Sequence, residues 1–268
     1  MADTPRERWA NGDIYEPYVG RWSRLVAQQF LAWLDAPPGL DWLDVGCGTG
    51  ALTEAIAGRH APASLAGIDA SPGFLAFAAV RVPTARFHHG DAQSLPFAAA
   101  SFDHVVSALM LNFVPDPALA LAEMTRVIRP GGQIALYVWD YAGEMQLMRR
   151  FWDAARALDP QGLTMGAATD EALRFPLCQP EKLRALFAAG GLDTIETRAI
   201  DVPTIFRDFD DYWTPFLGGQ APAPAYCMSL TEEARAALRE RLRTSLPTQP
   251  DGSIHLIARA WAIRGRKP

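Results

Sequence analysis

Between residues 40 and 140 the sequence alternates short runs of strand-forming residues with helical stretches. This alternation is typical of a parallel sheet whose two faces are covered by helices. Ser71 and Asp116 each stand before a proline, which places a capping side chain next to a first-turn proline and predicts two helix starts. The segment therefore predicts a doubly wound α/β sheet. Its expected strands are Leu40–Val45, Ser64–Asp69, Arg86–His89, His104–Ala108 and Gln133–Trp139.

The pattern changes after Trp139, where apolar spacing and turn signals predict helices over 141–159 and 180–189. Two later runs, Thr194–Phe206 and Ser253–Ile263, are rich in β-formers and are expected to add an antiparallel pair to the same sheet. The prediction is thus a mostly parallel sheet of seven strands. Between the last two strands, residues 207–250 are expected to form a helical insertion over one end of the sheet.

Composition excludes several classes of function. Of the 268 residues, 25 are Lys or Arg and 30 are Asp or Glu, and the net charge of -5 disfavours sequence-independent binding to nucleic acid. The three cysteines are widely spaced and lack nearby histidines at zinc-ligand spacing, so we expect no metal. The longest apolar run is too short to cross a bilayer, and the first 13 residues lack the apolar stretch of a secretory signal. We therefore expect a cytoplasmic protein that does not insert into a membrane.

A glycine-rich loop, Gly46-Cys47-Gly48-Thr49-Gly50, follows the first strand and opens onto a helix. Glycines there let the backbone turn sharply and lie against a ligand. Asp69, nineteen positions past Gly50, ends the second strand beside the switch point of the sheet, where it can accept hydrogen bonds from ribose hydroxyls. Each feature also has a purely structural explanation: the glycines can serve strand–helix packing, and Asp69 can cap the next helix.

The glycine spacing, with Asp44 just ahead of it, differs from the G-x-G-x-x-G of dinucleotide folds. It resembles motif I of the class I S-adenosylmethionine-dependent methyltransferases, in particular the small-molecule enzymes of methyltransferase type 11. Three further segments resemble that family in the same order: 90–92, 105–109 and 126–132. The resemblance implies a Rossmann-like methyltransferase fold and transfer of a methyl group from S-adenosyl-L-methionine to a small-molecule acceptor, with S-adenosyl-L-homocysteine as product.

The resemblance also implies roles for individual residues. Asp44 would lie near the methionine ammonium, Asp91 would hold the adenine amino group, and the backbone of Ala92 would meet the ring. Near the N-terminus, Tyr18 and Arg24 stand in a stretch similar to that of glycine N-methyltransferases, where a Tyr and an Arg close over the cofactor carboxylate. Arg21 is the second candidate for the arginine. Alternatively, these residues anchor the N-terminal helix to the sheet. The complete set expected to bind cofactor is Tyr18, Arg24, Asp44, Gly46, Cys47, Gly48, Asp69, Ala70, Asp91, Ala92 and Ser107.

The acceptor side carries weaker signals. The segment after the fourth strand lacks an Asn/Asp-Pro-Pro-Tyr sequence, which argues against nucleic-acid bases as acceptors and suggests an apolar wall with Asn112 as a polar contact. Trp213 and Phe216 are expected either to line the acceptor pocket or to form a hydrophobic mini-core. Methyl transfer from a sulfonium does not require a strong base, so Asp140 and Tyr141, which follow the fifth strand, are only candidate proton acceptors.

We expect one methyltransferase domain over 1–268, with N-terminal lid helices in 1–35, a cofactor-binding core in 40–140 and a substrate lid in 207–250. The alternatives are an NAD-dependent oxidoreductase, which the glycine spacing disfavours, and a non-catalytic cofactor-binding module. The sequence leaves open the acceptor, the atom methylated (O, N or C) and the oligomeric state.

Overall fold

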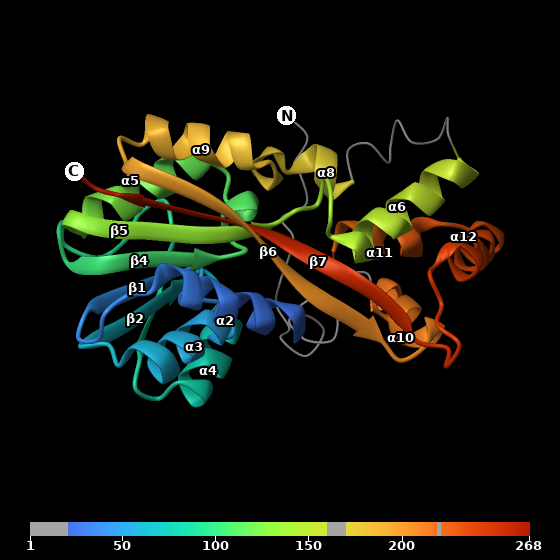
Figure 1. The fold of residues 1–268 in the computed structure, drawn as a ribbon, viewed down its shortest axis with the longest axis horizontal. Coiled ribbons are helices and arrows are strands. Elements are labelled where there is room, and N and C mark those ends of the chain that lie inside the picture. The colour runs from blue at the N-terminus through green and yellow to red at the C-terminus, as the bar shows by residue number, and fades with distance from the viewer. Residues whose placement is uncertain (1–20, 160–169, 219–220) are drawn as a thin grey trace.

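A computed structural model describes residues 21–159, 170–218 and 221–268. Its centre is a seven-stranded sheet of order β3-β2-β1-β4-β5-β7-β6 with helices on both sides (Figure 1). Strands β1 to β5 pair in parallel, while β7 runs antiparallel to both β5 and β6. The predicted α/β class and the predicted seven-stranded, mostly parallel sheet are therefore confirmed.

The strands match the predicted runs at most of their ends. β4 begins at Phe102 instead of His104, β7 runs to Arg266 instead of Ile263, and the largest difference is in β5. It begins at Ile128 instead of Gln133, because Ile128 pairs with Phe102 across a register shift and the Pro-Gly-Gly turn stays within the strand. The bounds are β1 Asp41–Val45, β2 Ser64–Asp69, β3 Arg86–His89, β4 Phe102–Ala108, β5 Ile128–Trp139, β6 Asp193–Phe206 and β7 Ile254–Arg266.

The two predicted capping residues, Ser71 and Asp116, stand directly before the helices α4 and α5. Ser71 accepts a hydrogen bond from Phe74 N–H at 3.3 Å, and Asp116 accepts two from the next helix at 3.0 Å. The helices are α2 Arg21–Leu34, α3 Ala51–His60, α4 Pro72–Arg81, α5 Pro117–Val127, α6 Gln146–Leu158, α8 Glu171–Arg174, α9 Pro180–Ala189, α10 Phe209–Trp213, α11 Pro222–Ser229 and α12 Glu232–Ser245, with 3-10 turns η2 Leu111–Phe113, η3 Pro176–Cys178 and η4 Thr214–Gly218.

Two apolar cores lie on opposite faces of the sheet. Figure 1 shows α2, α3 and α4 on one side and α5 and α9 on the other. Phe30 of α2 and Ile56 of α3 belong to the first core, and Leu121 of α5 and Leu183 of α9 to the second. This arrangement leaves the carboxyl ends of β1 and β4, which are neighbours although not consecutive, as the switch point at which open α/β sheets bind ligands.

The predicted insertion, residues 207–250, contains α10, η4, α11 and α12 and lies at the end of the molecule where β6 and β7 extend beyond the other strands (Figure 1). It packs on α6, which begins at Gln146 and not near Tyr141 as expected, because the turn before it is held by Asp140. No helix in the described ranges is long and apolar enough to cross a membrane.

Candidate functional site

The turn after β1 is built on three left-handed glycines. Their φ angles are 70° at Gly46, 52° at Gly48 and 85° at Gly50, a conformation that other residues adopt only with strain. The N–H groups of Gly46 and Cys47 donate to the carbonyl oxygen of Ile68 at 2.8 and 3.0 Å. These hydrogen bonds within the protein hold the loop against the end of β2.

The three glycines differ in what surrounds them. A Cβ at Gly46 would lie 2.3 Å from Cγ of Met110, and one at Gly50 would lie 3.1 Å from Cβ of Ala78. At Gly48, no atom would lie within 4 Å of an added Cβ. Gly50 thus allows close packing on α4, as the structural alternative predicted, and Gly46 packs under Met110. Gly48 leaves its backbone open to an approaching group, and cofactor contact by Gly46 and Gly48 stays a prediction.

Asp69 fixes this open glycine. Its Oδ2 accepts a hydrogen bond from Gly48 N–H at 2.9 Å, and its Oδ1 accepts one from Ser71 N–H at 2.8 Å. The carboxylate therefore orders the start of α4 and the glycine loop together. Each oxygen keeps a second acceptor position for a ligand hydroxyl. The neighbouring Ala70 is exposed, and its carbonyl oxygen lies 3.1 Å from Nε2 of His89.

Asp44 is fully buried on β1 and only half satisfied. Its Oδ2 accepts a hydrogen bond from Oγ1 of Thr53 at 2.7 Å, while its Oδ1 has no hydrogen-bond partner among the described residues. Burial raises the pKa of this carboxyl to about 7, and the nearby charge of Asp69 acts in the same direction. A buried oxygen without a partner calls for an explanation, and a bound cation would supply one.

Cys47 lies between these two acids, with 6% of its surface exposed. Burial and the two neighbouring carboxylates raise the pKa of its thiol far above the usual range, so the sulfur stays neutral. What Cys47 offers a ligand is therefore its backbone, and the side chain packs close to Gly67.

Asp91 and Ala92 follow β3 at the same edge of the sheet. Asp91 is exposed, and it accepts hydrogen bonds from Gln93 N–H at 2.9 Å and from Gln93 Nε2 at 3.2 Å. Gln93 in turn accepts from Asp116 N–H at 3.0 Å. On β4, the Ser107 hydroxyl is buried and makes no hydrogen bond within the described parts of the chain.

The chain leaves β4 through a strained residue. Leu109 has a φ of 61°, unusual for a residue with a side chain, and its N–H donates to the carbonyl oxygen of Tyr137 at 2.9 Å. Asn112 follows in η2, and its Oδ1 is buried without a partner in the described ranges. Met110 covers Gly46, and the ring of Phe113 meets that of Phe175 at 5.0 Å. Contact of this segment, and of Asn112 within it, with an acceptor stays a prediction.

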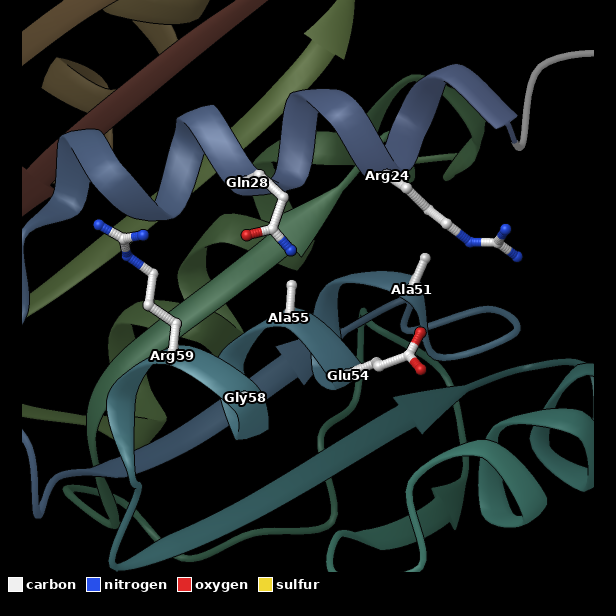
Figure 2. A pocket seen from close by; sticks show the side chains of 7 residues that line it. All are labelled: Arg24, Gln28, Ala51, Glu54, Ala55, Gly58 and Arg59. Carbon is white, nitrogen blue, oxygen red and sulfur yellow. The ribbon is translucent and has the colours of Figure 1, made fainter.

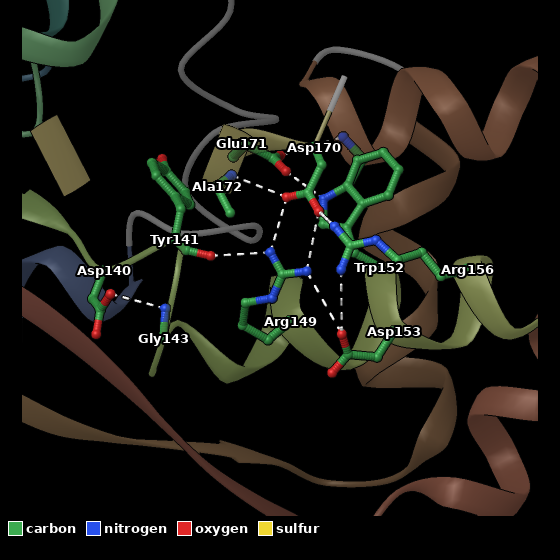
Figure 3. Close-up of polar contacts among 11 residues, drawn as sticks. Asp140, Tyr141, Gly143, Arg149, Trp152, Asp153, Arg156, Asp170, Glu171 and Ala172 are labelled. Atoms are coloured by element: carbon green, nitrogen blue, oxygen red, sulfur yellow. Dashed lines mark hydrogen bonds and ion pairs between the residues drawn. The ribbon is translucent and has the colours of Figure 1, made fainter. Parts of the chain in front are cut away.

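The two candidate proton acceptors lie in a tightly held turn (Figure 3). Asp140 is 5% exposed, and its oxygens accept hydrogen bonds from Gly143 N–H at 2.9 Å and Glu144 N–H at 3.0 Å. Tyr141 is 7% exposed, and its ring lies 5.6 Å from that of Phe175. Asp140 therefore stabilises the turn that leads from β5 into α6. A role as a base stays a prediction for both.

A buried ionic cluster next to this turn was not predicted from the sequence (Figure 3). Asp170 accepts paired hydrogen bonds from Arg149 at 2.9 and 3.1 Å and another from Arg156, so α8 is tied to α6. The adjacent Glu171 is 2% exposed and accepts from Nε1 of Trp152. Burial raises the pKa of Glu171 to about 7. On α6 itself both arginines also pair with Asp153, Arg149 at 3.6 Å and Arg156 at 3.9 Å. This spacing in the sequence explained the two arginines locally, so nothing in it pointed to Asp170.

The arginines of α2 point to different places. Arg24 is exposed and lines a cavity of about 360 Å³ between α2 and α3 (Figure 2). Arg21 instead lies over the ring of Trp22 at 4.3 Å and approaches Oδ1 of Asp211 at 3.4 Å, which fits the anchoring alternative. Tyr18, the other predicted lid residue, lies outside the described residues. The cavity is lined by Arg24, Gln28, Ala51, Glu54, Ala55, Gly58 and Arg59.

Trp213 and Phe216 are buried, with 4% and 0% of their surface exposed. The ring of Phe216 stacks on Phe151 of α6 at 4.4 Å and 12°. This burial favours the mini-core interpretation, and contact of either ring with an acceptor stays a prediction. Members of the aromatic cluster are Phe151, Trp152, Phe206, Phe209, Tyr212, Trp213, Phe216 and Tyr226. Within the described ranges, no group of three or more His, Cys, Asp or Glu side chains could hold a metal ion.

Comparison with known proteins identifies a matching family model, a similar sequence and two similar structures. Residues 43–136 match the family model of the methyltransferase domain. A demethylmenaquinone methyltransferase of Renibacterium salmoninarum is 41% identical over 43% of this chain and 46% of its own length. Among solved structures, a Bacillus halodurans protein has a TM-score of 0.59 at 16% identity, over 90% of this chain and 98% of its own.

A second structure is the phosphoethanolamine N-methyltransferase 2 of Haemonchus contortus in complex with S-adenosyl-L-methionine. It has a TM-score of 0.59 at 16% identity, over 98% of this chain and 58% of its own. The chain spans about half the length of the curated relatives that it matches. The match to the family model covers the segment that carries the glycine loop, Asp69 and Asp91.

Proposed function

We propose that this chain, whose residues 43–136 form a class I S-adenosylmethionine-dependent methyltransferase domain, transfers a methyl group from S-adenosylmethionine to a small-molecule acceptor. The observation that carries the proposal is the meeting of three features at one edge of the sheet. These are the open backbone of Gly48, the carboxylate of Asp69 that orders it, and the unsatisfied buried oxygen of Asp44.

The residues present fit that cofactor. Asp44 offers a buried negative oxygen to the methionine ammonium, the one strong positive group that a ligand of this class brings. Asp69 keeps acceptor positions for the ribose hydroxyls. Asp91 and Ala92 follow the neighbouring strand, where a carboxylate and a backbone N–H suit the donor and acceptor atoms of adenine.

S-adenosylmethionine supplies a methyl group on a sulfonium, which a nucleophile takes by in-line displacement. The contribution of this chain would then be to orient the acceptor and to exclude water, which suits the apolar residues after β4. Asn112 presents a buried oxygen that can accept a hydrogen bond from the acceptor. Asp140 holds the turn after β5 through its carboxylate, and a role of Asp140 or Tyr141 as proton acceptor is not needed for this proposal.

The acceptor is proposed to be an apolar small molecule, because the chain that leaves β4 is apolar at Leu109, Met110 and Leu111 and would give an acceptor bound at this edge apolar surroundings. The name of the R. salmoninarum relative, a demethylmenaquinone methyltransferase, agrees with an apolar ring compound. The expected cytoplasmic location stays a prediction, which fractionation of cells that express the protein tests.

A screen of candidate acceptors with methyl-labelled S-adenosylmethionine tests this function. We expect a labelled product and one equivalent of S-adenosylhomocysteine for an apolar acceptor, and a much slower release of both by the Asp69→Ala variant when the cofactor is not saturating. Hydride transfer with NADH and a carbonyl compound, without release of S-adenosylhomocysteine under any condition, would instead support the oxidoreductase alternative.

A further inference from the structure

We propose that Glu123 and Arg126 of α5 are a positioning pair that holds the adenine-binding loop, residues 91–97, in its binding geometry. This inference rests on the proposed function, because it concerns the segment that would meet the adenine ring. Neither residue would touch the cofactor. Both would act through the backbone that carries Asp91 and Ala92.

The pair satisfies the backbone of the loop directly. Arg126 donates from Nη2 to the carbonyl oxygen of Leu95 and from Nη1 to that of Phe97, both at 2.8 Å. Glu123 Oε2 accepts a hydrogen bond from Leu95 N–H at 2.8 Å. Three backbone groups of the loop are thus bound by two side chains from one helix.

The two side chains also hold each other. Arg126 Nε lies 2.6 Å from Oε1 of Glu123, and Nη2 lies 2.8 Å from Oε2. The paired, charge-assisted geometry fixes the planar guanidinium, which leaves its outer donors aimed at the loop. The hydrogen bond and charge of Arg126 hold the pKa of the Glu123 carboxyl below its usual range, so the pair stays ionised near neutral pH.

The loop has little structure of its own. Apart from the bridge between Asp91 and Ser94, the segment forms turns and bends without helix or strand. Backbone groups that lack sheet or helix partners need other partners, and α5 provides them. A second tie from the same helix acts at Gln93, which accepts from the N–H of Asp116, the cap of α5, and donates to the Asp91 carboxylate.

The helix is a rigid platform for this task. Leu121 and Met124 of α5 are 1% and 0% exposed within the second core. The position of α5 is therefore set by the sheet, and the pair transmits that position to the loop. Loss of the pair is expected to widen the range of positions of Asp91 and so to weaken adenine binding, while the core stays packed.

Arg129 provides a matched control. It lies three residues after Arg126 and is equally exposed, with 38% of its side-chain surface accessible against 37%. It makes ion pairs with Asp41 at 2.9 Å and Asp103 at 2.7 Å. Those partners stand at the amino ends of β1 and β4, the edge of the sheet opposite to the candidate site. Arg126→Ala and Arg129→Ala should therefore lose a similar amount of stability, whereas only Arg126→Ala should weaken adenine binding.

The test is a calorimetric titration with S-adenosylhomocysteine and with its inosine analogue, which lacks the amino group. For Arg126→Ala we expect the Kd for S-adenosylhomocysteine to rise about tenfold and the preference over the inosine analogue to shrink. Arg126→Lys should recover part of the affinity, since an ammonium can still donate to one loop carbonyl. Arg129→Ala should change the Kd less than twofold. Equal changes in Kd for Arg126→Ala and Arg129→Ala would overturn the inference.

Hydrogen exchange of the free protein separates this inference from the proposed function. In Arg126→Ala, the Leu95 amide should exchange at least tenfold faster than in wild type, and in Arg129→Ala at nearly the wild-type rate. An unchanged Leu95 rate in Arg126→Ala would overturn the inference whether or not the protein binds cofactor. Wild-type protein that binds no S-adenosylhomocysteine would contradict the proposed function, and the exchange result would still decide the role of the pair.

Discussion

The N–H of Gly48 donates to Oδ2 of Asp69 over 2.9 Å, so a single carboxylate orders the one glycine of the loop that faces open space. The same carboxylate accepts a second backbone hydrogen bond from Ser71 at the start of α4. The residue expected to bind ribose is therefore also a structural part of the loop, and the two roles do not exclude each other.

The substitution Asp69→Ala should weaken S-adenosylmethionine binding by about 1.5–3 kcal/mol, through loss of charge-assisted hydrogen bonds. It should also lower the free energy of unfolding by about 1 kcal/mol, because two backbone N–H groups lose their acceptor. Calorimetric titration and urea unfolding measure the two effects. Binding equal to wild type would refute the assignment of Asp69.

Gly46 and Gly48 should respond differently to substitution. Gly46→Ala should lower the melting temperature, since the new Cβ would lie 2.3 Å from a Met110 side-chain atom. Gly48→Val should abolish cofactor binding with a smaller loss of stability, because its side chain would occupy open space at a φ of 52°. Thermal melts with and without S-adenosylhomocysteine compare the two variants, and the reverse order of effects would contradict these roles.

The alternation of strands and helices was enough to predict the sheet, since local periodicity and turn residues suffice where propensity and tertiary packing agree. The start of α6 was missed because Asp140 holds a turn, and the two residues directly before α6 pair with β7: Met145 bridges to Ala258, and Glu144 accepts a hydrogen bond from Arg259 N–H. Such pairing joins residues more than a hundred positions apart and has no periodic signal in the sequence.

Cofactor affinity should depend on pH through Asp44. Burial raises the pKa of this carboxyl to about 7, so in the free protein it is largely protonated below that pH. An ammonium attracts only the ionised form, and affinity should therefore fall by up to about tenfold for each pH unit below 7. The Kd for S-adenosylhomocysteine between pH 5.5 and 8.5 tests this. In Asp44→Asn the binding should be weaker and the dependence much flatter; an identical profile in both proteins would exclude Asp44 as its source.

His104 should make the fold sensitive to acid. Its ring stacks on Trp42 at 4.4 Å, and burial, with the charge of Arg266, lowers its pKa to about 4. The stability that depends on neutral His104 is complete above pH 6.5 and is lost as the pH falls toward 4, by up to about 3 kcal/mol. His104→Phe keeps the stacking without the titration. The gap in unfolding free energy between variant and wild type should widen from pH 7 to 4.5, and a constant gap would contradict this account.

Phe216→Ala should lower the unfolding free energy by about 3–5 kcal/mol, the usual cost of removing a fully buried aromatic ring. In Trp213→Ala the two interpretations differ. The pocket interpretation predicts a raised KM for the acceptor with cofactor affinity near wild type, whereas the mini-core interpretation predicts a lowered melting temperature and similar losses of affinity for both ligands. Hydrogen exchange decides between them, since ligand-dependent protection in 207–250 would favour the pocket.

The sequence could single out the aromatic residues of the insertion. It could not tell whether their rings pack in a core or line a pocket, because aromatic clusters and aromatic pockets have the same composition. It also could not reveal that Asp44 keeps one oxygen unsatisfied, or that Arg126 reaches the loop after β3 from another helix. These relationships join residues far apart in the chain. Their chemistry follows from residue type, whereas their pairing follows from the packing of α3 and α5 on the sheet.

The central claim is that the edge of the sheet beside Gly48 and Asp69 binds S-adenosylmethionine. Titration calorimetry of the wild-type protein at pH 8, with S-adenosylmethionine, S-adenosylhomocysteine and NADH as separate ligands, tests it most directly. We predict one binding site per chain for each of the first two ligands, strongly weakened in Asp69→Ala, and no binding of NADH. Saturable binding of NADH, together with no heat from either S-adenosyl compound, would contradict the account.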